Sequence, residues 1–554
     1  MFLVAPRLSG ALLGAVCALA RTSLGAKLLW VQMGRDYGLG DLMSLPPSAR
    51  GELELEPRPQ QAAAPRQWED QGFAVPSSER CTGDALRRAY LTGTSTPLDV
   101  MKALKTRVEA ADFGDATHSP FICCDWERAF EAAQESTDRY QSGSVLSRLD
   151  GIPIPIKDEH EMQGLVTAAG TAYVDAVAEQ DSTLVARLRE RGALLYAKTH
   201  TTEWGMNPWG MNPHFAYPRN VYDSDRGAGG SSTGAGVAVG LGLATVAVGS
   251  DGGGSIRIPA AFNGVFGLKP TFGRIGRGGS LFGCSSVSHF GPLAASVTDC
   301  VDFLLETALG ADPLDPPTFY STDHATAAEA WARAPGRGVR GCRIGIMRAE
   351  MEAADTAVRN ACLEALRALE SEGAVLVDVD VALSEHALAV GVLSIATETM
   401  AGLIDDYRAH GRQMGGDLQL LLDLMARASA KEYLIARRTR PMIRAALKQS
   451  IANVDVLALP TTCTVAPKYA ASEQGVSIAD DLANQNACRL NFLGNITGLP
   501  AGSVPVGMHE GLPIGLQIMG DAWDEASVIA VMTHCERLGL AGLPLPKSSS
   551  VLLP

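Results

Sequence analysis

Two glycine- and serine-rich loops near the middle of the chain constrain its fold more than any other feature. The first, GAGGSSTGAG, begins at Gly227, and the second, GSDGGGSIRIPA, begins at Gly249. Between them, VAVGLGLATVAVG has the pattern of a helix end that leads into a buried strand. Such a short unit folds back on itself, so we expect the two serine-bearing loops to lie close together.

Units of helix, glycine and strand recur elsewhere and predict an α/β layer fold. Residues 183–191 have a helical pattern, Gly192 ends it, and residues 193–197 (ALLYA) read as a strand. Later, four apolar residues share one helix face before Gly373 and the strand AVLVDVD. These four are Val358, Cys362, Leu366 and Leu369. Residues 385–450 are expected to be mostly helical, either as core helices or as a cap over a substrate pocket.

The second loop has the composition of an anion-binding turn that carries a nucleophile. In Gly252, Gly253 and Gly254, successive backbone N–H groups can point into one concavity. A tetrahedral intermediate of acyl transfer carries a negative oxygen that needs such donors. Ser255 follows directly, so its hydroxyl would lie beside its own oxyanion hole. The loop lacks the Gly-Lys-Ser/Thr ending of a nucleotide-binding loop.

A serine hydroxyl needs a base, and Lys157 is the favoured candidate. It ends the apolar, proline-flanked segment GIPIPIK, where partial desolvation would lower its pKa toward neutrality. The alternative interpretation is a surface lysine paired with Asp158. His214 and His289 are within plausible range as bases, but nothing in the sequence marks them.

These segments together resemble the amidase signature family over residues 85–540. The resemblance rests on eight segments that occur in the family's order. They are GIPIPIKD, AKTHTTEWGMN, NPHFAYPRN, GGSSTG, GSDGGGSIRIPAAFNGVFGLKPTFGRI, GPLAASVTD, NITGLPAGSVPVG and GLPIGLQIMG. The resemblance implies one α/β domain with a central mixed sheet surrounded by helices.

The resemblance also implies the roles of individual residues. Lys157, Ser231 and Ser255 would form the catalytic triad, with Ser231 in a cis peptide bond between the other two. The oxyanion donors would be the amides of Gly252, Gly253, Gly254 and Ser255. Three further residues, Ser232, Asp251 and Arg257, would support the site. The substrate would be a small-molecule amide, without metal or organic cofactor, and the family's frequent dimers make a homodimer an expectation.

Other interpretations of the site stay open at this stage. A carbamate or ester hydrolase, or the glutaminase subunit of an aminoacyl-tRNA amidotransferase, would use the same residues. Gly230 to Gly234 also fits the GxSxG elbow of an α/β-hydrolase, with Ser232 as nucleophile. That elbow needs a preceding strand, whereas NVYDSDRGAGG is turn-like. A non-catalytic binding protein would have little reason to keep a buried lysine.

The net charge and the cysteine and histidine content argue against several classes of partner and site. The formal net charge is -14, which repels phosphate backbones and argues against a nucleic-acid partner. The 11 cysteines are scattered without a CxxC pair, and a chain this long needs no disulfide framework. The histidines show no HExxH or paired spacing, so no zinc site is predicted.

The amino-terminal segment is apolar from Leu8 to Ala20, between Arg7 and Arg21. It fits a cleaved signal, an interfacial membrane anchor or a helix packed on the protein's own body, and we favour the anchor. A membrane-associated or exported location is therefore preferred over a cytoplasmic one. The predicted organisation is an apolar segment at 1–45, a proline-rich arm at 46–80 and the amidase domain at 81–545.

Overall fold

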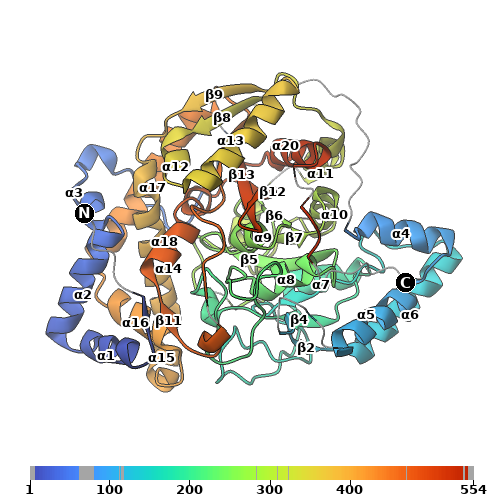
Figure 1. Cartoon of the computed structure of the whole chain (residues 1–554), viewed down its shortest axis with the longest axis horizontal. Coiled ribbons are helices and arrows are strands. Elements are labelled where there is room, and N and C mark those ends of the chain that lie inside the picture. The colour runs from blue at the N-terminus through green and yellow to red at the C-terminus, as the bar shows by residue number, and fades with distance from the viewer. Residues whose placement is uncertain are drawn as a thin grey trace.

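A mixed sheet of eleven strands runs through the molecule (Figure 1). The computed structural model describes residues 7–61, 80–110, 113, 118–281, 283–308, 310–321, 324–469, 471–540 and 543–546. The strand order is β2-β4-β3-β5-β7-β6-β12-β13-β10-β8-β9. The strands are β2 (Phe121–Cys124), β3 (Ile156–Lys157), β4 (Ala197–Thr199), β5 (Val246–Asp251), β6 (Phe266–Lys269), β7 (His289–Ala294), β8 (Arg343–Met347), β9 (Val375–Val379), β10 (Val456–Pro460), β12 (Ala501–His509) and β13 (Leu512–Gly520).

Helices surround this sheet, as the predicted α/β fold requires. Those of the first half are α4 (Gly83–Thr92), α5 (Pro97–Ala110), α6 (Trp126–Ser142), α7 (Thr183–Glu190), α8 (Thr233–Gly240), α9 (Arg257–Phe262) and α10 (Val297–Thr307). Those of the second half are α11 (His324–Arg333), α12 (Arg348–Glu352), α13 (Thr356–Ser371), α14 (Ala387–Gly402), α15 (Ile404–His410), α16 (Gly416–Met425), α17 (Ala430–Ile451), α18 (Asp481–Cys488), α19 (Phe492–Thr497) and α20 (Glu525–Arg537).

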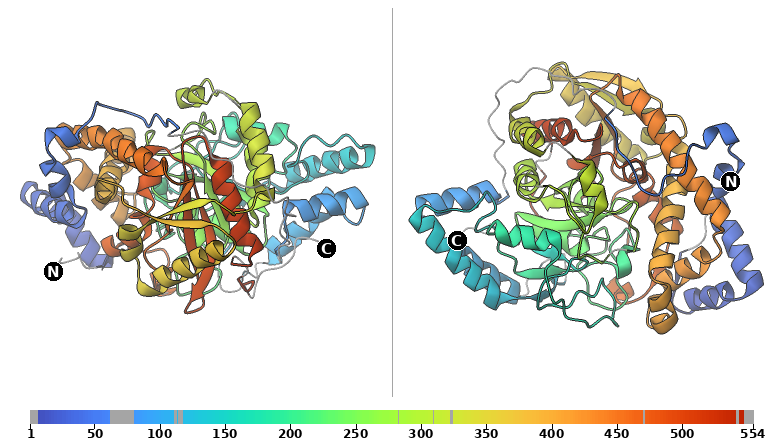
Figure 2. Two further views of the ribbon diagram at one scale, coloured as in Figure 1. Left: turned by 90° about the horizontal axis from the view of Figure 1, so that it is seen from above. Right: turned by 180° about the vertical axis from the view of Figure 1, so that it is seen from behind.

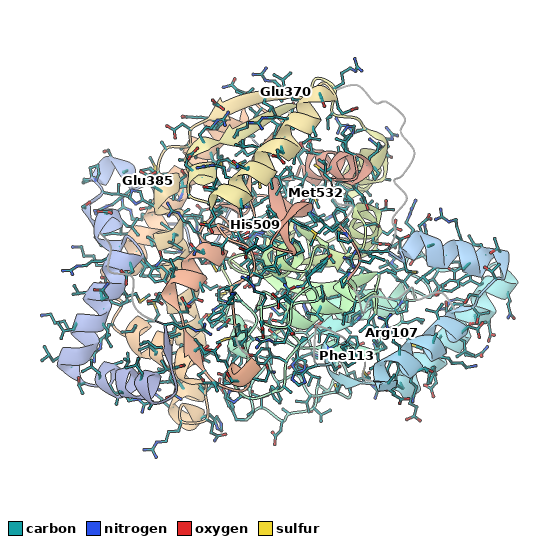
Figure 3. All side chains as sticks on the ribbon, in the orientation of Figure 1. Arg107, Phe113, Glu370, Glu385, His509 and Met532 are labelled. Atoms are coloured by element: carbon teal, nitrogen blue, oxygen red, sulfur yellow. The ribbon has the colours of Figure 1, made fainter. Side chains whose placement is uncertain are left out.

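Successive side chains of β10 point to opposite faces of the sheet and belong to two separate apolar clusters. Val456 and Ala458 belong to a large apolar cluster with residues of α13 and α20. Leu457 and Leu459 point the other way, into a second cluster with residues of α14, α17 and the amino-terminal helices. Figure 2 shows these amino-terminal helices beside α17, far from α4 and α5. In Figure 3 Met532 of α20 lies inside the molecule, whereas Glu370 and Glu385 lie at its edge.

Most of the predicted elements are confirmed, and one strand is displaced. The helix face of Val358 to Leu369 is buried in α13, and β9 follows it. The strand expected at 193–197 begins instead at Ala197, and Leu194 makes only an isolated bridge to Pro153. The physical reason is the neighbouring segment, since Pro153 and Pro155 lack the N–H groups that a continuous ladder needs.

The amino-terminal segment forms α1 (Gly10–Ala20), α2 (Ser23–Asp36) and α3 (Leu39–Ser44). One face of α1 is buried through Leu13, Cys17 and Ala20, in the cluster that also contains residues of α16. Among the described residues no single helix is long and apolar enough to cross a membrane. The α1–α2 pair passes that test only jointly and is bent by 109°. The buried face of α1 therefore packs on the rest of the protein, and its other face remains exposed.

The predicted arm lies partly along α17. The Gly51 amide donates to the Arg438 carbonyl at 2.8 Å, and the Arg437 Nε donates to the Glu54 carbonyl at 3.0 Å. Arg444 forms an ion pair of 2.7 Å with the Glu54 carboxylate. The rest of the arm, residues 62–79, lies outside the described residues.

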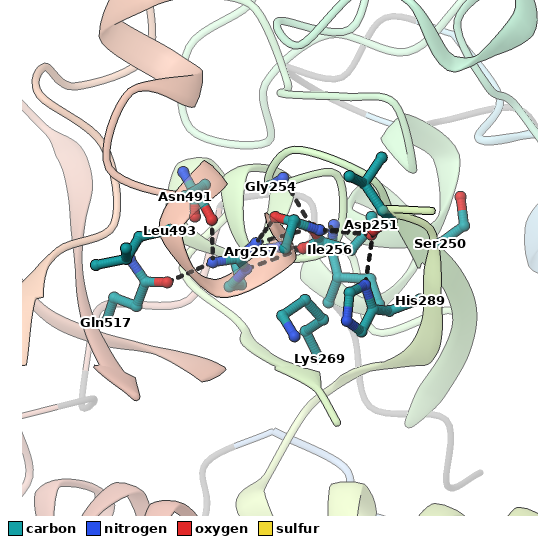
Figure 4. Close-up of polar contacts among 12 residues, drawn as sticks. Ser250, Asp251, Gly254, Ile256, Arg257, Lys269, His289, Asn491, Leu493 and Gln517 are labelled. Carbon is teal, nitrogen blue, oxygen red and sulfur yellow. Dashed lines mark hydrogen bonds and ion pairs between the residues drawn. The ribbon is translucent and has the colours of Figure 1, made fainter. Parts of the chain in front are cut away.

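A buried ion pair fixes the loop between β5 and α9 (Figure 4). Asp251 ends β5, Arg257 begins α9, and both side chains are fully buried. The guanidinium donates to both carboxylate oxygens, at 2.8 and 2.9 Å, and also binds Asn495 at 2.6 Å. Burial alone would raise the pKa of Asp251, but Arg257, together with Lys269 and Asn495, outweighs it and holds the pKa well below its usual range.

Replacing Arg257 tests how strongly this pair stabilises the fold. Arg257→Met keeps the volume but leaves the Asp251 charge buried without its positive partner, so we expect a loss of about 3–5 kcal/mol in the free energy of unfolding. Arg408→Met is the matched control, because Arg408 and its partner Asp405 are 72% and 91% exposed. The control should change stability by less than about 0.5 kcal/mol. Urea unfolding of both variants measures this, and equal midpoints would contradict the expectation.

Candidate active site

Three neighbouring elements bring the predicted site residues together. Lys157 ends β3, which pairs in parallel with β5 through Ile156 and Val248. Ser231 lies just before α8, and Ser255 lies in the loop that follows β5. The chain runs from Ser231 through α8 and β5 to Ser255, so the expected helix–strand unit returns the second loop to the first. The Ser232 amide donates to the Ser255 carbonyl at 3.3 Å, which joins the two loops directly.

Lys157 lies at the centre of a buried polar cluster. Its Nζ donates to Ser231 Oγ at 2.7 Å and to Ser250 Oγ at 2.7 Å. A carboxylate oxygen of Glu159 lies 3.0 Å away, and the other accepts from Ser250 Oγ at 2.6 Å. Burial lowers the pKa of Lys157 from its ordinary value, and this effect exceeds the opposing effect of Glu159. The lysine amine is thereby shifted toward the neutral form that a base requires.

The two serines of the first loop make different contacts. The peptide bond between Gly230 and Ser231 is cis, which confirms the expectation for Ser231. Ser232 Oγ exchanges hydrogen bonds of 3.2 Å with the Ser250 carbonyl and amide, so it joins α8 to β5. No hydrogen bond joins the side chains of Ser231 and Ser255 among the described residues. Ser231 is buried, whereas Ser255 is partly exposed and lines a pocket.

The glycine loop presents free backbone donors beside Ser255. Within the described part of the chain, the amides of Gly252, Gly253 and Ser255 have no hydrogen-bond partner. The Gly254 amide differs from the expectation, because it donates to Asp251 Oδ1 at 2.8 Å. Gly254 also has a φ of +117°, a conformation that L side chains rarely adopt. A Cβ at Gly253 would lie 2.7 Å from the Phe492 ring, so this position also requires glycine.

The alternative partners from the sequence lie elsewhere. Asp158 pairs with Lys198 at 3.3 Å, so the interpretation of a Lys157–Asp158 surface pair is wrong. His214 Nε2 lies 2.9 Å from Glu203, and His289 Nδ1 lies 2.7 Å from the Val287 carbonyl. Burial lowers the pKa of His289 well below its ordinary value. The residues before Ser232 form turns rather than the strand that a nucleophile elbow needs.

Ser255 and Gly253 open onto a pocket with a mainly apolar lining. Its apolar wall comes largely from the predicted helical region and joins α14, α16 and α19. Prominent members are Leu388, Val392, Ile395, Leu420, Leu424 and Phe492. Both interpretations of residues 385–450 therefore hold, since these helices are part of the core and also line the pocket. Asn207, Asp417 and Asp481 supply polar groups to the same lining.

Sequence reasoning missed three residues of the site. Glu159 follows Lys157 by two positions, and the period of two along an extended segment could have placed both on one side. Ser250 reaches Lys157 only because β5 pairs with β3, which no local pattern reveals. Asp417 lies on α16 in the pocket, far from every conspicuous motif.

Known proteins resemble this chain over most of its length. The sequence profile of the Amidase family matches residues 99–529. Fatty acid amide hydrolase of Oryza sativa subsp. indica is 33% identical over 459 residues, covering 82% of this chain and 75% of that protein. A glutamyl-tRNA(Gln) amidotransferase subunit from Chloroflexus aurantiacus is 32% identical over 486 residues, covering 82% of this chain and 96% of that protein.

Solved structures show the same fold. The native peptide amidase from Stenotrophomonas maltophilia superposes with a TM-score of 0.72 at 26% identity, covering 85% of this chain and 99% of that one. A structure described as an amidase gives a TM-score of 0.71 at 30% identity, covering 82% and 99%. The family match, the relatives and the fold agree, and the chain therefore belongs to the Amidase family and is a hydrolase that acts on amides.

Proposed function

We propose that the chain cleaves amides through an acyl-enzyme on Ser255, with Ser231 and Lys157 as the proton relay. The observation that carries the proposal is the 2.7 Å contact between Lys157 Nζ and Ser231 Oγ. This contact is made by a buried lysine whose pKa is lowered by burial. A neutral amine can accept a hydroxyl proton, which turns a serine into a nucleophile.

In the first step, Ser255 Oγ attacks the amide carbonyl carbon. Its proton moves to Ser231 Oγ, while the Ser231 proton moves to neutral Lys157. The carbonyl π electrons move onto oxygen, which becomes an oxyanion. The free amides of Gly252, Gly253 and Ser255 are the proposed donors to it, and Gly254 instead holds the loop through Asp251.

In the second step, the tetrahedral intermediate collapses and the C–N bond breaks. Ser231 gives its proton to the leaving nitrogen and regains one from Lys157, so the amine departs neutral and the relay returns to its starting state. Water then attacks the Ser255 ester, with its proton taken by the same relay. This releases the carboxylic acid and restores the Ser255 hydroxyl.

The pocket favours an apolar acyl group over glutamine. The apolar wall on α14, α16 and α19 can bury a hydrocarbon chain. Among the described lining residues there is no lysine, arginine or histidine that would pair with the carboxylate of glutamine. We therefore propose an N-acyl amide with an apolar acyl chain rather than a glutaminase role. Carbamates and esters of similar shape are secondary candidates, because the same nucleophile would attack them.

Single and double variants test the relay. Ser255→Ala should abolish hydrolysis of an N-decanoyl p-nitroanilide, and Lys157→Ala and Ser231→Ala should each lower kcat/KM by at least about 1,000-fold. Because the relay acts as one unit, kcat/KM of the double variant Lys157→Ala/Ser231→Ala should fall about as much as that of either single variant. Spectrophotometric release of p-nitroaniline measures this. A histidine-dependent enzyme would tolerate Lys157→Ala and lose activity at one histidine, which would refute the proposal.

The pH dependence should report the charge of Lys157. Because neutral Lys157 is the base, kcat/KM should rise with pH to a plateau, through an apparent pKa below the ordinary lysine value of about 10.4. Glu159→Gln removes the carboxylate that stabilises the ammonium form, so the rising limb should move to lower pH by about 1–3 units. Glu161→Gln is the control. An unmoved limb in Glu159→Gln would exclude Lys157 as the titrating base.

We also propose that α1 and α2 hold the protein at an anionic membrane surface. Leu12, Leu24 and Leu28 are 54%, 70% and 60% exposed on these helices. The first 35 residues carry Arg and Lys but no Asp or Glu, in a chain of net charge -14. Exposed leucines beside basic residues suit insertion into the interface of anionic lipid.

Vesicle sedimentation tests this membrane proposal. The protein should pellet with vesicles that contain phosphatidylserine and much less with pure phosphatidylcholine, and high salt should weaken the binding. The double variant Leu24→Glu/Leu28→Glu should stay in the supernatant. Leu314→Glu, at an equally exposed leucine far along the chain, should bind as the wild type does. Equal binding of all three proteins would overturn the proposal.

A further inference from the structure

The charged side chains that line the described part of the pocket beside Ser255 are all carboxylates. Its described lining contains the carboxylates of Asp417 and Asp481 and no cationic side chain. Asp481 lies in the first turn of α18, within 3.5 Å of the Tyr37 hydroxyl. Asp417 lies in the first turn of α16, beside Asn207. A pocket with this lining repels an anionic substrate group and attracts a cationic one.

Asp417 has unused capacity to accept a hydrogen bond. Its Oδ2 accepts from Asn207 Nδ2 at 3.4 Å, and the backbone amides of Asp417 and Leu418 also stabilise the carboxylate, but its buried Oδ1 has no partner at full hydrogen-bond geometry among the described residues. Burial, with a contribution from the Glu203 carboxylate, raises the pKa of Asp417 to about 6, which still leaves it mostly ionised at neutral pH. A buried carboxylate oxygen without a donor is costly, so a donor from the substrate would be favoured.

One wall of the pocket connects Ser231 to Asp417. The segment Gly205 to Pro208 lines the pocket, and a Cβ at Gly205 would lie 3.3 Å from Ser231 Oγ. Two residues further along, Asn207 binds Asp417. This wall therefore leads from Ser231, the proposed proton donor to the leaving nitrogen, toward Asp417.

The apolar wall begins at a different part of the site. A Cβ at Gly252 would lie 3.1 Å from Ile395 Cδ1, and Gly253 lies against the Phe492 ring. The hydrocarbon-lined space thus adjoins the glycine loop that would hold the carbonyl oxygen. An amide bound at Ser255 would direct its acyl chain along this wall and its amine portion toward Asn207 and Asp417.

We propose that Asp417 determines leaving-group specificity, and that the preferred substrates are N-acylated diamines or polyamines whose amine portion carries a second, positive charge. Asp417 pairs with that distal ammonium, while Ser231 protonates the nitrogen that leaves. Amides whose amine portion carries a carboxylate, such as N-acyl amino acids, are poor substrates. The inference rests on the proposed Ser255 function and adds the class of amine to it.

Three amides with one decanoyl chain test the inference. They are N-(2-aminoethyl)decanamide, N-(2-hydroxyethyl)decanamide and N-decanoylglycine, which are cationic, neutral and anionic at neutral pH. For the wild type, kcat/KM should fall in that order. Asp417→Asn should lower the ratio of the cationic to the neutral amide by about ten-fold.

The controls separate the two levels of the proposal. Asp423→Asn, on the same helix but paired with Arg21 and outside the pocket lining, should keep the wild-type ratio. If Ser255→Ala abolishes hydrolysis but Asp417→Asn leaves the ratio unchanged, the specificity inference is wrong and the catalytic proposal stands. If Ser255→Ala retains hydrolysis, the catalytic proposal fails. Equal cleavage of the cationic and anionic amides by the wild type overturns the inference without any variant.

Discussion

The buried ion pair between Asp251 and Arg257 is the interaction on which the site depends. Two opposite charges without solvent must satisfy each other and their remaining hydrogen bonds, which leaves few arrangements of the chain between them. The Asp251 carboxylate also accepts from the amides of Gly254 and Ile256. These amides are drawn inward to the carboxylate, so the remaining amides of the loop are left for a substrate. The same pair ties the loop to Asn495 on α19, far along the chain.

Burial and a neighbouring carboxylate have opposite effects on the pKa of Lys157. A buried lysine tends to lose its proton, and an adjacent carboxylate tends to keep it charged. Glu159, Ser250 and Ser231 all contact the amine. The carboxylate therefore limits how far the pKa of Lys157 falls, and in the proposed relay this would set the pH range of catalysis. Around the lysine of the proposed triad, the structure therefore adds two contacts, from Glu159 and Ser250.

The sequence was sufficient for features encoded locally. Glycine spacing, the helix face of α13 and the apolar strands follow from the chain's own periodicity, and the motif resemblance supplied Lys157, Ser231 and Ser255. The remaining features depend on pairing between distant segments. The strand at β4 starts late because of prolines in its neighbour, Ser250 meets Lys157 through strand pairing, and Asp417 joins the pocket through helix packing. The sequence predicted a free Gly254 amide, whereas in the structure this amide donates to Asp251.

The central claim is that Ser255 is the nucleophile, and covalent labelling tests it most directly. Intact-mass spectrometry after treatment with a fluorophosphonate probe would be compared for the wild type, Ser255→Ala and Ser232→Ala. We predict one adduct on the wild type and on Ser232→Ala, and none on Ser255→Ala. An adduct that survives in Ser255→Ala but disappears in Ser232→Ala would contradict the proposed relay and support a nucleophile elbow at Ser232.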